Sequence, residues 1–125
     1  MLKEKLEFYR SVLMEKRMFI LSTIERLREM SQIKETEVDL HEKYSYHLAD
    51  QSSDSLRREE SFMLISRELI YLNRIDNALK SIDHGDYGIC KVCGKEIPHE
   101  RLEAVPTTDT CISCKTTHIK RFNMN

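Results

Sequence analysis

The sequence has no tryptophan, only three glycines and two prolines, and aromatic residues make up just 7% of it. Charged residues make up 33% of the 125 residues, which is too polar for a large core, while a 40% hydrophobic content is too high for a disordered chain. The scarcity of helix breakers, with many Leu, Ile and Met residues, favours long exposed helices. The length allows one domain, or one small module on an extension.

The sequence also lacks an excess of charge of one sign and a long apolar run. The formal net charge is -1, so bulk electrostatics does not attract the chain to nucleic acid. No stretch of about 18 apolar residues is present, so we expect no membrane span. The first residues, Met-Leu-Lys-Glu-Lys, lead into charged helical sequence rather than the apolar core of a signal peptide, and we expect a cytoplasmic protein.

Glycine and proline are confined to the last third of the chain. The first glycine is Gly85 and the first proline is Pro98, so no strong breaker interrupts residues 1–84. This change of composition predicts two parts, a helical part over residues 1–84 and a small compact module over residues 85–125.

Residues 1–84 carry two apolar stripes with helical spacing. Neither stripe can be buried alone in water, so we predict a mostly α fold with a long antiparallel helical hairpin packed as a short coiled coil. The second helix is expected over about residues 54–84, about 45 Å long at a rise of about 1.5 Å per residue. The first stripe consists of Leu2, Leu6, Tyr9, Leu13, Ile20, Ile24 and Leu27, and the second of Phe62, Ile65, Leu69, Leu72, Ile75, Leu79 and Ile82.

The tip of the hairpin must lie within about residues 32–54, where the apolar period is lost. The first helix is expected either to stop near residue 32 or to continue past Leu40 towards Tyr46. A loop of about 20 residues is unusual unless it is functional, so we expect an irregular or partly helical tip.

All four cysteines lie in two pairs, Cys90-Lys-Val-Cys93 and Cys111-Ile-Ser-Cys114. Two residues between cysteines let one tight turn present two sulfurs to one ion, and two such pairs separated by 17 residues are typical of a four-thiolate zinc site. Gly94 follows the first pair, where such a turn often needs a positive φ. We predict one structural Zn²⁺ held by these four cysteines, which stabilises a module too small to fold alone.

Three other interpretations of the cysteines have less support. Two disulfides fit a secreted protein, and nothing in the sequence suggests secretion. A rubredoxin-like iron site uses similar turns, but electron transfer needs no long hairpin. A catalytic zinc needs an open ligand position, which four thiolates close.

Residues around the cysteines complete the expected module. His99 and His118 are interpreted as exposed polar residues rather than further ligands. The segment that begins at Cys111 predicts a short terminal helix, with Ile112, Ile119 and Phe122 docked on the base of the hairpin.

The module resembles a known family in three strings, Asp86-Tyr-Gly-Ile-Cys-Lys-Val-Cys-Gly-Lys-Glu-Ile, Arg101-Leu-Glu-Ala-Val-Pro-Thr and Cys111-Ile-Ser-Cys-Lys115. In order and distance they resemble the DksA/TraR zinc-finger family of bacterial transcription regulators. The resemblance covers about residues 50–118, and the first helix matches only in kind. It implies binding to bacterial RNA polymerase, a hairpin inserted into the polymerase secondary channel, and regulation of initiation, often together with the nucleotide ppGpp. It implies no sequence-specific DNA binding.

The resemblance also implies a role for acidic residues at the tip, near the polymerase active site. Counted back from Cys90 without a gap, Asp50 falls on the second aspartate of the family pattern Asp-x-x-Asp-x-Ala. Asp54 is the second candidate, and both aspartates are alternatively caps of the second helix.

The same count places Arg67, Arg74 and Lys115 where the family uses basic residues for ppGpp or polymerase. Each of the three is alternatively a solvated surface residue. Val105 falls where some members carry an arginine that contacts the nucleotide, and the loss of a guanidinium weakens phosphate binding.

Three functions stay open on the sequence alone. A monomeric polymerase-binding regulator is motivated by the hairpin, the zinc module and Asp50. A zinc-containing DNA-binding or protein-adaptor module would need a concentrated basic face, which the net charge does not promise. A structural coiled-coil protein would oligomerise through its apolar stripe. No nucleophile–base pair or phosphate loop is visible, so we do not expect an enzyme.

Overall fold

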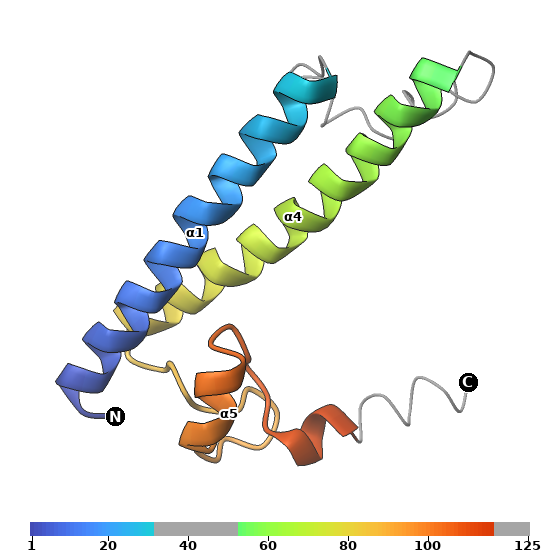
Figure 1. Cartoon of the computed structure of the whole chain (residues 1–125). Coiled ribbons are helices and arrows are strands. Elements are labelled where there is room, and N and C mark those ends of the chain that lie inside the picture. Colours follow the sequence, from blue (N-terminus) through green and yellow to red (C-terminus); the bar gives the residue numbers. More distant parts are fainter. Residues whose placement is uncertain (32–52, 117–125) are drawn as a thin grey trace. The chain divides into compact units, whose positions relative to one another are not determined.

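The computed structural model describes residues 1–31 and 53–116. It contains two long helices, α1 (Lys3–Ser31) and α4 (Ser53–His84), and a short helix α5 (His99–Ala104), and residues 112–116 form a further helical turn (Figure 1). Among these residues the only strand-like pairing is an isolated antiparallel bridge between Ile89 and Glu96. The predicted fold class, a helical hairpin followed by a small four-cysteine module, is confirmed.

Contacts divide the chain into two compact units, and each contains a part of both long helices. The first unit comprises residues 1–15 and 74–125, and the second comprises residues 16–73. The predicted boundary between a helical part and a zinc module at residue 85 rests on composition and stays a prediction.

The end of α4 is determined by Gly85, and the predicted second helix over about 54–84 is confirmed. Gly85 has a φ of 82°, the left-handed conformation that glycine adopts without steric cost. Its N–H donates to the carbonyl of Ile82 at 3.3 Å, and the N–H of Asp86 donates to that of Ser81 at 3.1 Å. These are the two hydrogen bonds of a Schellman motif, which ends the helix and turns the chain into the cysteine module.

The first unit has a core shared by the hairpin base and the cysteine module. Tyr9 and Leu13 of α1 are buried, as are Ile75 and Ile82 of α4. The ring centroid of Tyr9 lies 5.5 Å from that of Tyr87 in the module. The module is therefore packed directly on the base of the two helices.

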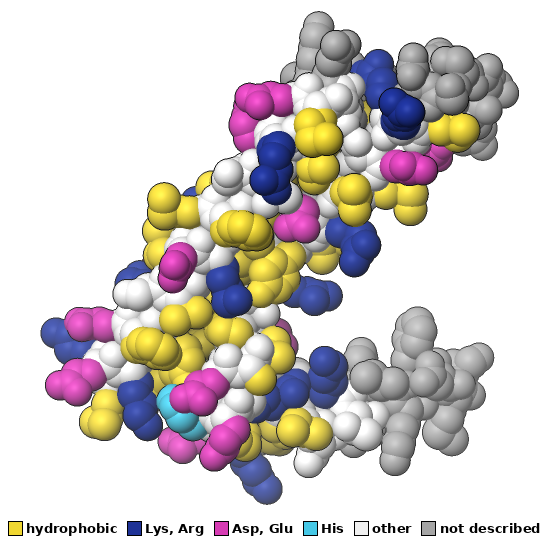
Figure 2. Space-filling model, viewed as in Figure 1, with side chains coloured by type: hydrophobic (Ala, Val, Ile, Leu, Met, Phe, Trp, Pro, Cys, Tyr) yellow, Lys and Arg dark blue, Asp and Glu magenta, His cyan; other side chains and the backbone are white. Residues whose placement is uncertain are grey.

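The second unit is built from the remaining lengths of α1 and α4. Ile20 and Ile24 of α1 and Phe62 and Ile65 of α4 are its buried apolar side chains, at 0–3% exposure. Both predicted stripes therefore supply the core along the helices. Figure 2 shows hydrophobic and charged side chains interspersed over the surface of both helices on the face in view.

Two expectations about apolar residues are wrong. Leu2 is 71% exposed and does not belong to the buried stripe. Ile112 is 60% exposed, so it does not dock on the hairpin base, and Ile119 and Phe122 lie outside the described residues. Several other members of the stripes are only half-buried, namely Leu6, Leu27, Leu69, Leu72 and Leu79.

The tip of the hairpin, including Asp50, lies outside the described residues. The described part of α1 ends at Ser31, next to the shorter of the two predicted ends. Asp54 is the second residue of α4. No helix within residues 1–31 or 53–116 combines the length and the apolar character needed to cross a membrane.

Candidate zinc site and the adjoining cationic pocket

The first cysteine pair lies on a tight turn closed by backbone hydrogen bonds. The N–H of Cys90 donates to the carbonyl of Lys95 at 2.8 Å, and the N–H of Gly94 donates to the carbonyl of Cys90 at 2.9 Å. Gly94 has a φ of 75°, so the predicted positive φ is confirmed. This local geometry presents both sulfurs of the pair from one small loop.

The second pair opens the helical turn over residues 112–116. The N–H of Lys115 donates to the carbonyl of Cys111 at 3.0 Å, which begins the turn and brings Cys114 back beside Cys111. A separate hydrogen bond joins the two loops, because the N–H of Lys91 donates to the carbonyl of Asp109 at 2.9 Å. The backbone itself therefore holds the two cysteine pairs next to each other.

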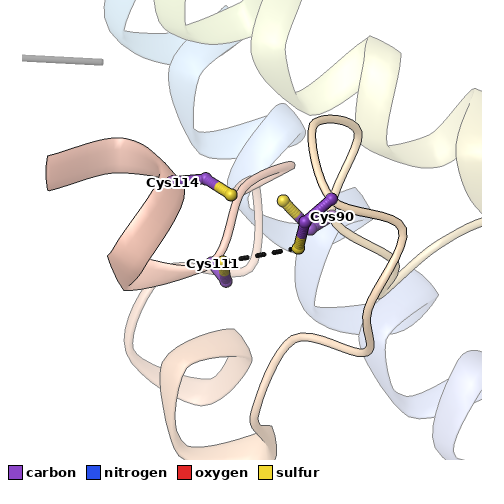
Figure 3. A group of neighbouring side chains, drawn as sticks. Cys90, Cys111 and Cys114 are labelled. Carbon is purple, nitrogen blue, oxygen red and sulfur yellow. Dashed lines mark hydrogen bonds between the residues drawn. The ribbon is translucent and has the colours of Figure 1, made fainter. Parts of the chain in front are cut away.

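The four sulfur atoms form one cluster, in which all lie within 4.8 Å of one another. Figure 3 shows Cys90, Cys111 and Cys114 converging from the two loops. The sulfurs of Cys93 and Cys111 are 3.8 Å apart, and a tetrahedral site with zinc–sulfur bonds of about 2.3 Å has sulfur–sulfur edges of about 3.8 Å. The donor set fits one Zn²⁺ with every position filled by protein, so the zinc is structural, as predicted.

The backbone prepares part of the cluster for metal binding. The N–H groups of Cys93 and Cys111 lower the pKa of the Cys90 thiol to about 6. The N–H of Cys114 likewise lowers the pKa of Cys111. The pKa of Cys114 is raised to about 12, chiefly because its thiol donates a hydrogen bond to Cys111. Four thiolates this close repel one another, and a bound dication offsets that repulsion.

Two side-chain hydrogen bonds brace the cluster and were not predicted. The hydroxyl of buried Tyr87 donates to the carbonyl of Pro106 at 2.7 Å, and this burial raises the pKa of the tyrosine. Arg101 Nε donates to the carbonyl of Thr110 at 2.8 Å. Both donors belong to the strings that carry the family resemblance, but cysteine spacing contains no signal for their partners.

His99, a histidine of the zinc module, contacts two other side chains. His99 Nδ1 lies 2.8 Å from the hydroxyl of Tyr9, and His99 Nε2 lies 2.8 Å from a carboxylate oxygen of Glu103. These contacts join His99, the first residue of α5, to Tyr9 of α1 and to Glu103 of α5, and His99 does not belong to the thiol cluster. His118 lies outside the described residues.

A pocket of about 520 Å³ adjoins the cysteine loops and is formed entirely by residues of the first unit. Four cations line it, Arg74 of α4, Lys91, Arg101 and Lys115, against two carboxylates. In a chain with a net charge of -1, this local surplus of positive charge favours an anion. We call this the cationic pocket.

Comparison with known proteins assigns the module to a family. The model of the family described as "Prokaryotic dksA/traR C4-type zinc finger" matches residues 85–120. The RNA polymerase-binding transcription factor DksA of Haemophilus influenzae is 44% identical over 68 residues, which cover 51% of this chain and 47% of that protein. The structure of transcription factor DksA2 from Pseudomonas aeruginosa superposes with a TM-score of 0.78 and 27% identity, over 97% of this chain and 88% of that one. Residues 85–120 therefore carry a zinc finger of the DksA/TraR type.

The similarity between this chain and DksA2 extends over the helical hairpin as well as the zinc finger. A second relative by sequence is the uncharacterised protein YteA of Bacillus subtilis, 48% identical over 67 residues, which cover 54% of this chain and 28% of YteA. The chain thus spans about half or less of the length of these two curated relatives.

The structure brings together some of the residues to which the DksA/TraR resemblance gave roles. Arg74 and Lys115 line the cationic pocket, and so does Val105. Arg67 does not line this pocket and belongs to the second unit. Lys91 and Arg101 are additional pocket cations that the sequence did not single out. The roles given to the basic residues and to the tip stay predictions.

Proposed function

We propose that this chain binds bacterial RNA polymerase and regulates transcription initiation, acting in the bacterial cytoplasm where that polymerase works. One observation carries the proposal. A four-cysteine zinc finger is packed on the base of a long helical hairpin, through contacts such as that between Tyr9 and Tyr87, in a chain whose DksA relatives are named as RNA polymerase-binding transcription factors.

The proposed mode of action uses the hairpin as a probe that enters the secondary channel of the polymerase. α4 has 32 residues, which corresponds to about 48 Å at a rise of about 1.5 Å per residue. A helix pair of this length can carry a carboxylate deep into a pore. We assign this carboxylate to Asp50, with Asp54 as the second candidate. Close to a magnesium ion a carboxylate acts electrostatically and need not perform chemistry itself.

In this proposal the zinc finger stabilises the base of the hairpin. Bound zinc holds the two cysteine loops together, and the hydrogen bonds of Tyr87 and Arg101 add to that restraint. We assign Arg74 and Lys115, which share the cationic pocket, to contacts with ppGpp or with the polymerase. Arg67, which lies apart from the pocket, is assigned to the same kind of contact at a separate place.

The deciding experiment mixes the full-length, zinc-loaded chain with purified bacterial RNA polymerase. We expect co-sedimentation with the enzyme and an altered yield of transcripts from ribosomal-type promoters. The Asp50→Asn variant should bind normally and lose the regulatory effect, while Asp54→Asn serves as the matched neighbour. Absence of polymerase binding, with salt-sensitive binding to duplex DNA instead, would favour the zinc-containing DNA-binding module. Full regulation by Asp50→Asn would exclude the tip role alone.

A further inference from the structure

Lys91 is held at the rim of the cationic pocket by the fold of the first cysteine loop. It follows Cys90 directly, and its N–H donates to the carbonyl of Asp109 at 2.9 Å. This backbone bond ties Lys91 to the loop that leads to the second cysteine pair, whatever its side chain contacts. Lys91 lines the same pocket as Arg74 and Lys115, which come from α4 and from the second loop.

The side chain of Lys91 is only weakly engaged. Its Nζ lies 3.7 Å from a carboxylate oxygen of Asp109, and the two side chains are 57% and 60% exposed. Charge-assisted hydrogen bonds are about 2.7–2.9 Å long, and exposed ion pairs of looser geometry contribute little. The ammonium of Lys91 can therefore leave Asp109 for a stronger anion with little loss.

The other cations of the pocket differ in how they are held. Arg101 uses Nε to donate to the carbonyl of Thr110 at 2.8 Å, which anchors its guanidinium to the loop that leads to the second cysteine pair. Among the described residues no carboxylate pairs with Arg74 or Lys115. Asp109 is thus the carboxylate in this pocket that already competes for one of its cations.

We propose that Lys91 is a further phosphate-binding residue of the cationic pocket, and that Asp109 lowers the affinity of the pocket slightly, because its weak ion pair with the Lys91 ammonium breaks when an anion binds. The inference deepens the proposed function, because it takes the ligand to be a phosphate-bearing nucleotide bound while the chain is on polymerase. An anion that enters the pocket gains a third cation from a loop which the zinc site keeps in place.

The magnitude follows from the kind of contact. A hydrogen bond to a charged group, once removed, weakens binding by about tenfold or more. Lys91→Ala should therefore bind ppGpp about tenfold more weakly, whereas Lys91→Arg keeps the charge and most of the affinity. Asp109→Asn removes the competing charge and keeps the backbone carbonyl that accepts from Lys91, so affinity should rise by about threefold.

The test measures ppGpp that binds to the complex of full-length chain and RNA polymerase in excess of ppGpp that binds to polymerase alone. Lys95→Ala is the matched control, because Lys95 is an exposed lysine of the same loop that does not line the pocket. The zinc content of every variant is measured, so that a misfolded loop is recognised. If the Lys91 ammonium binds the anion, the salt dependence of binding is also shallower in Lys91→Ala than in the wild type.

The outcomes separate this inference from the function on which it rests. Equal ppGpp affinity of Lys91→Ala and the wild type, in complexes that form normally, overturns the role of Lys91 and leaves polymerase binding intact. Equal losses in Lys91→Ala and Lys95→Ala overturn it as well, because the effect would then be one of general charge. If the chain does not bind polymerase, the proposed function fails. The same titration on the chain alone then decides the role of Lys91, and absence of binding there overturns it.

Discussion

Tyr87 connects the two cysteine loops through one buried hydrogen bond. Its hydroxyl donates to the carbonyl of Pro106 at 2.7 Å, and both residues are buried. Tyr87→Phe would leave that carbonyl without a donor, which costs about 1–3 kcal/mol of unfolding free energy. Urea denaturation of the zinc-loaded chain at neutral pH measures the loss. Tyr9→Phe is the control with a smaller expected loss, because the partner of Tyr9 is half-exposed His99 and water can replace the hydroxyl.

The same residue predicts a pH dependence. Burial raises the pKa of Tyr87, with a further contribution from neighbouring Tyr9, so the folded protein keeps this phenol neutral at a pH where the unfolded chain ionises it. The stabilisation is complete below about pH 10, the ordinary pKa of tyrosine, and is lost as the pH rises above that value. Tyr87→Phe should lower the slope of stability against pH in this range. A wild-type stability that does not change between neutral and strongly alkaline pH would contradict the assignment.

Single residues differ in how well the sequence predicts them. The cysteine cluster and the positive φ of Gly94 follow from local spacing, because two residues between cysteines permit only a tight turn. The bond between Tyr87 and Pro106 joins positions 19 apart, and the place of Lys91 in a pocket depends on Asp109. Contacts between residues so far apart in the sequence arise from tertiary packing, so no local sequence pattern predicts them.

At the scale of elements, the helices were predictable and the depth of their burial was not. The spacing of apolar residues by three and four predicted both stripes, and the position of Gly85 predicted the end of α4. Leu69, Leu72 and Leu79 are nevertheless only half-buried. Two helices cover only a narrow seam of each other, so side chains at the edges of a wider apolar stripe stay in contact with water.

The narrow seam makes the cost of a substitution depend steeply on position. Ile65 is 0% exposed and Ile70 is 57% exposed on the same helix. Ile65→Ala should lower the unfolding free energy by about 2–5 kcal/mol, while Ile70→Ala should change it by less than about 1 kcal/mol. Thermal unfolding followed by far-ultraviolet circular dichroism compares the two variants. Similar losses for both would mean that the second unit buries a different face of α4.

At the scale of the whole molecule, composition separated a breaker-free part from a glycine-rich and proline-rich module, while contacts divide the chain differently. The hairpin base, residues 1–15 and 74–84, belongs to the same unit as the zinc finger. The cationic pocket illustrates the reason, since Arg74, Lys91 and Lys115 come from three segments that only the folded unit brings together. The proposal of a polymerase partner likewise rests on the family resemblance and not on the spacing of residues.

The division into units predicts what happens when zinc is lost. Structural zinc contributes about 10–16 kcal/mol in small finger peptides, as much as the whole stability of an ordinary domain, which is about 5–15 kcal/mol. A strong chelator, or the Cys114→Ser variant, should therefore abolish amide protection over residues 85–116. The second unit has its own core, which includes Ile24 and Phe62, and should keep its protection.

Hydrogen exchange with residue-level detection, together with zinc analysis, measures both effects in one sample. Thr116→Ala is the control, because Thr116 is an exposed residue of the same helical turn and contributes no sulfur. Equal loss of protection in both units would mean that zinc stabilises the hairpin as a whole. Retention of one zinc by Cys114→Ser, with unchanged protection of the finger, would mean that three thiolates suffice and that the fourth position is open to another ligand.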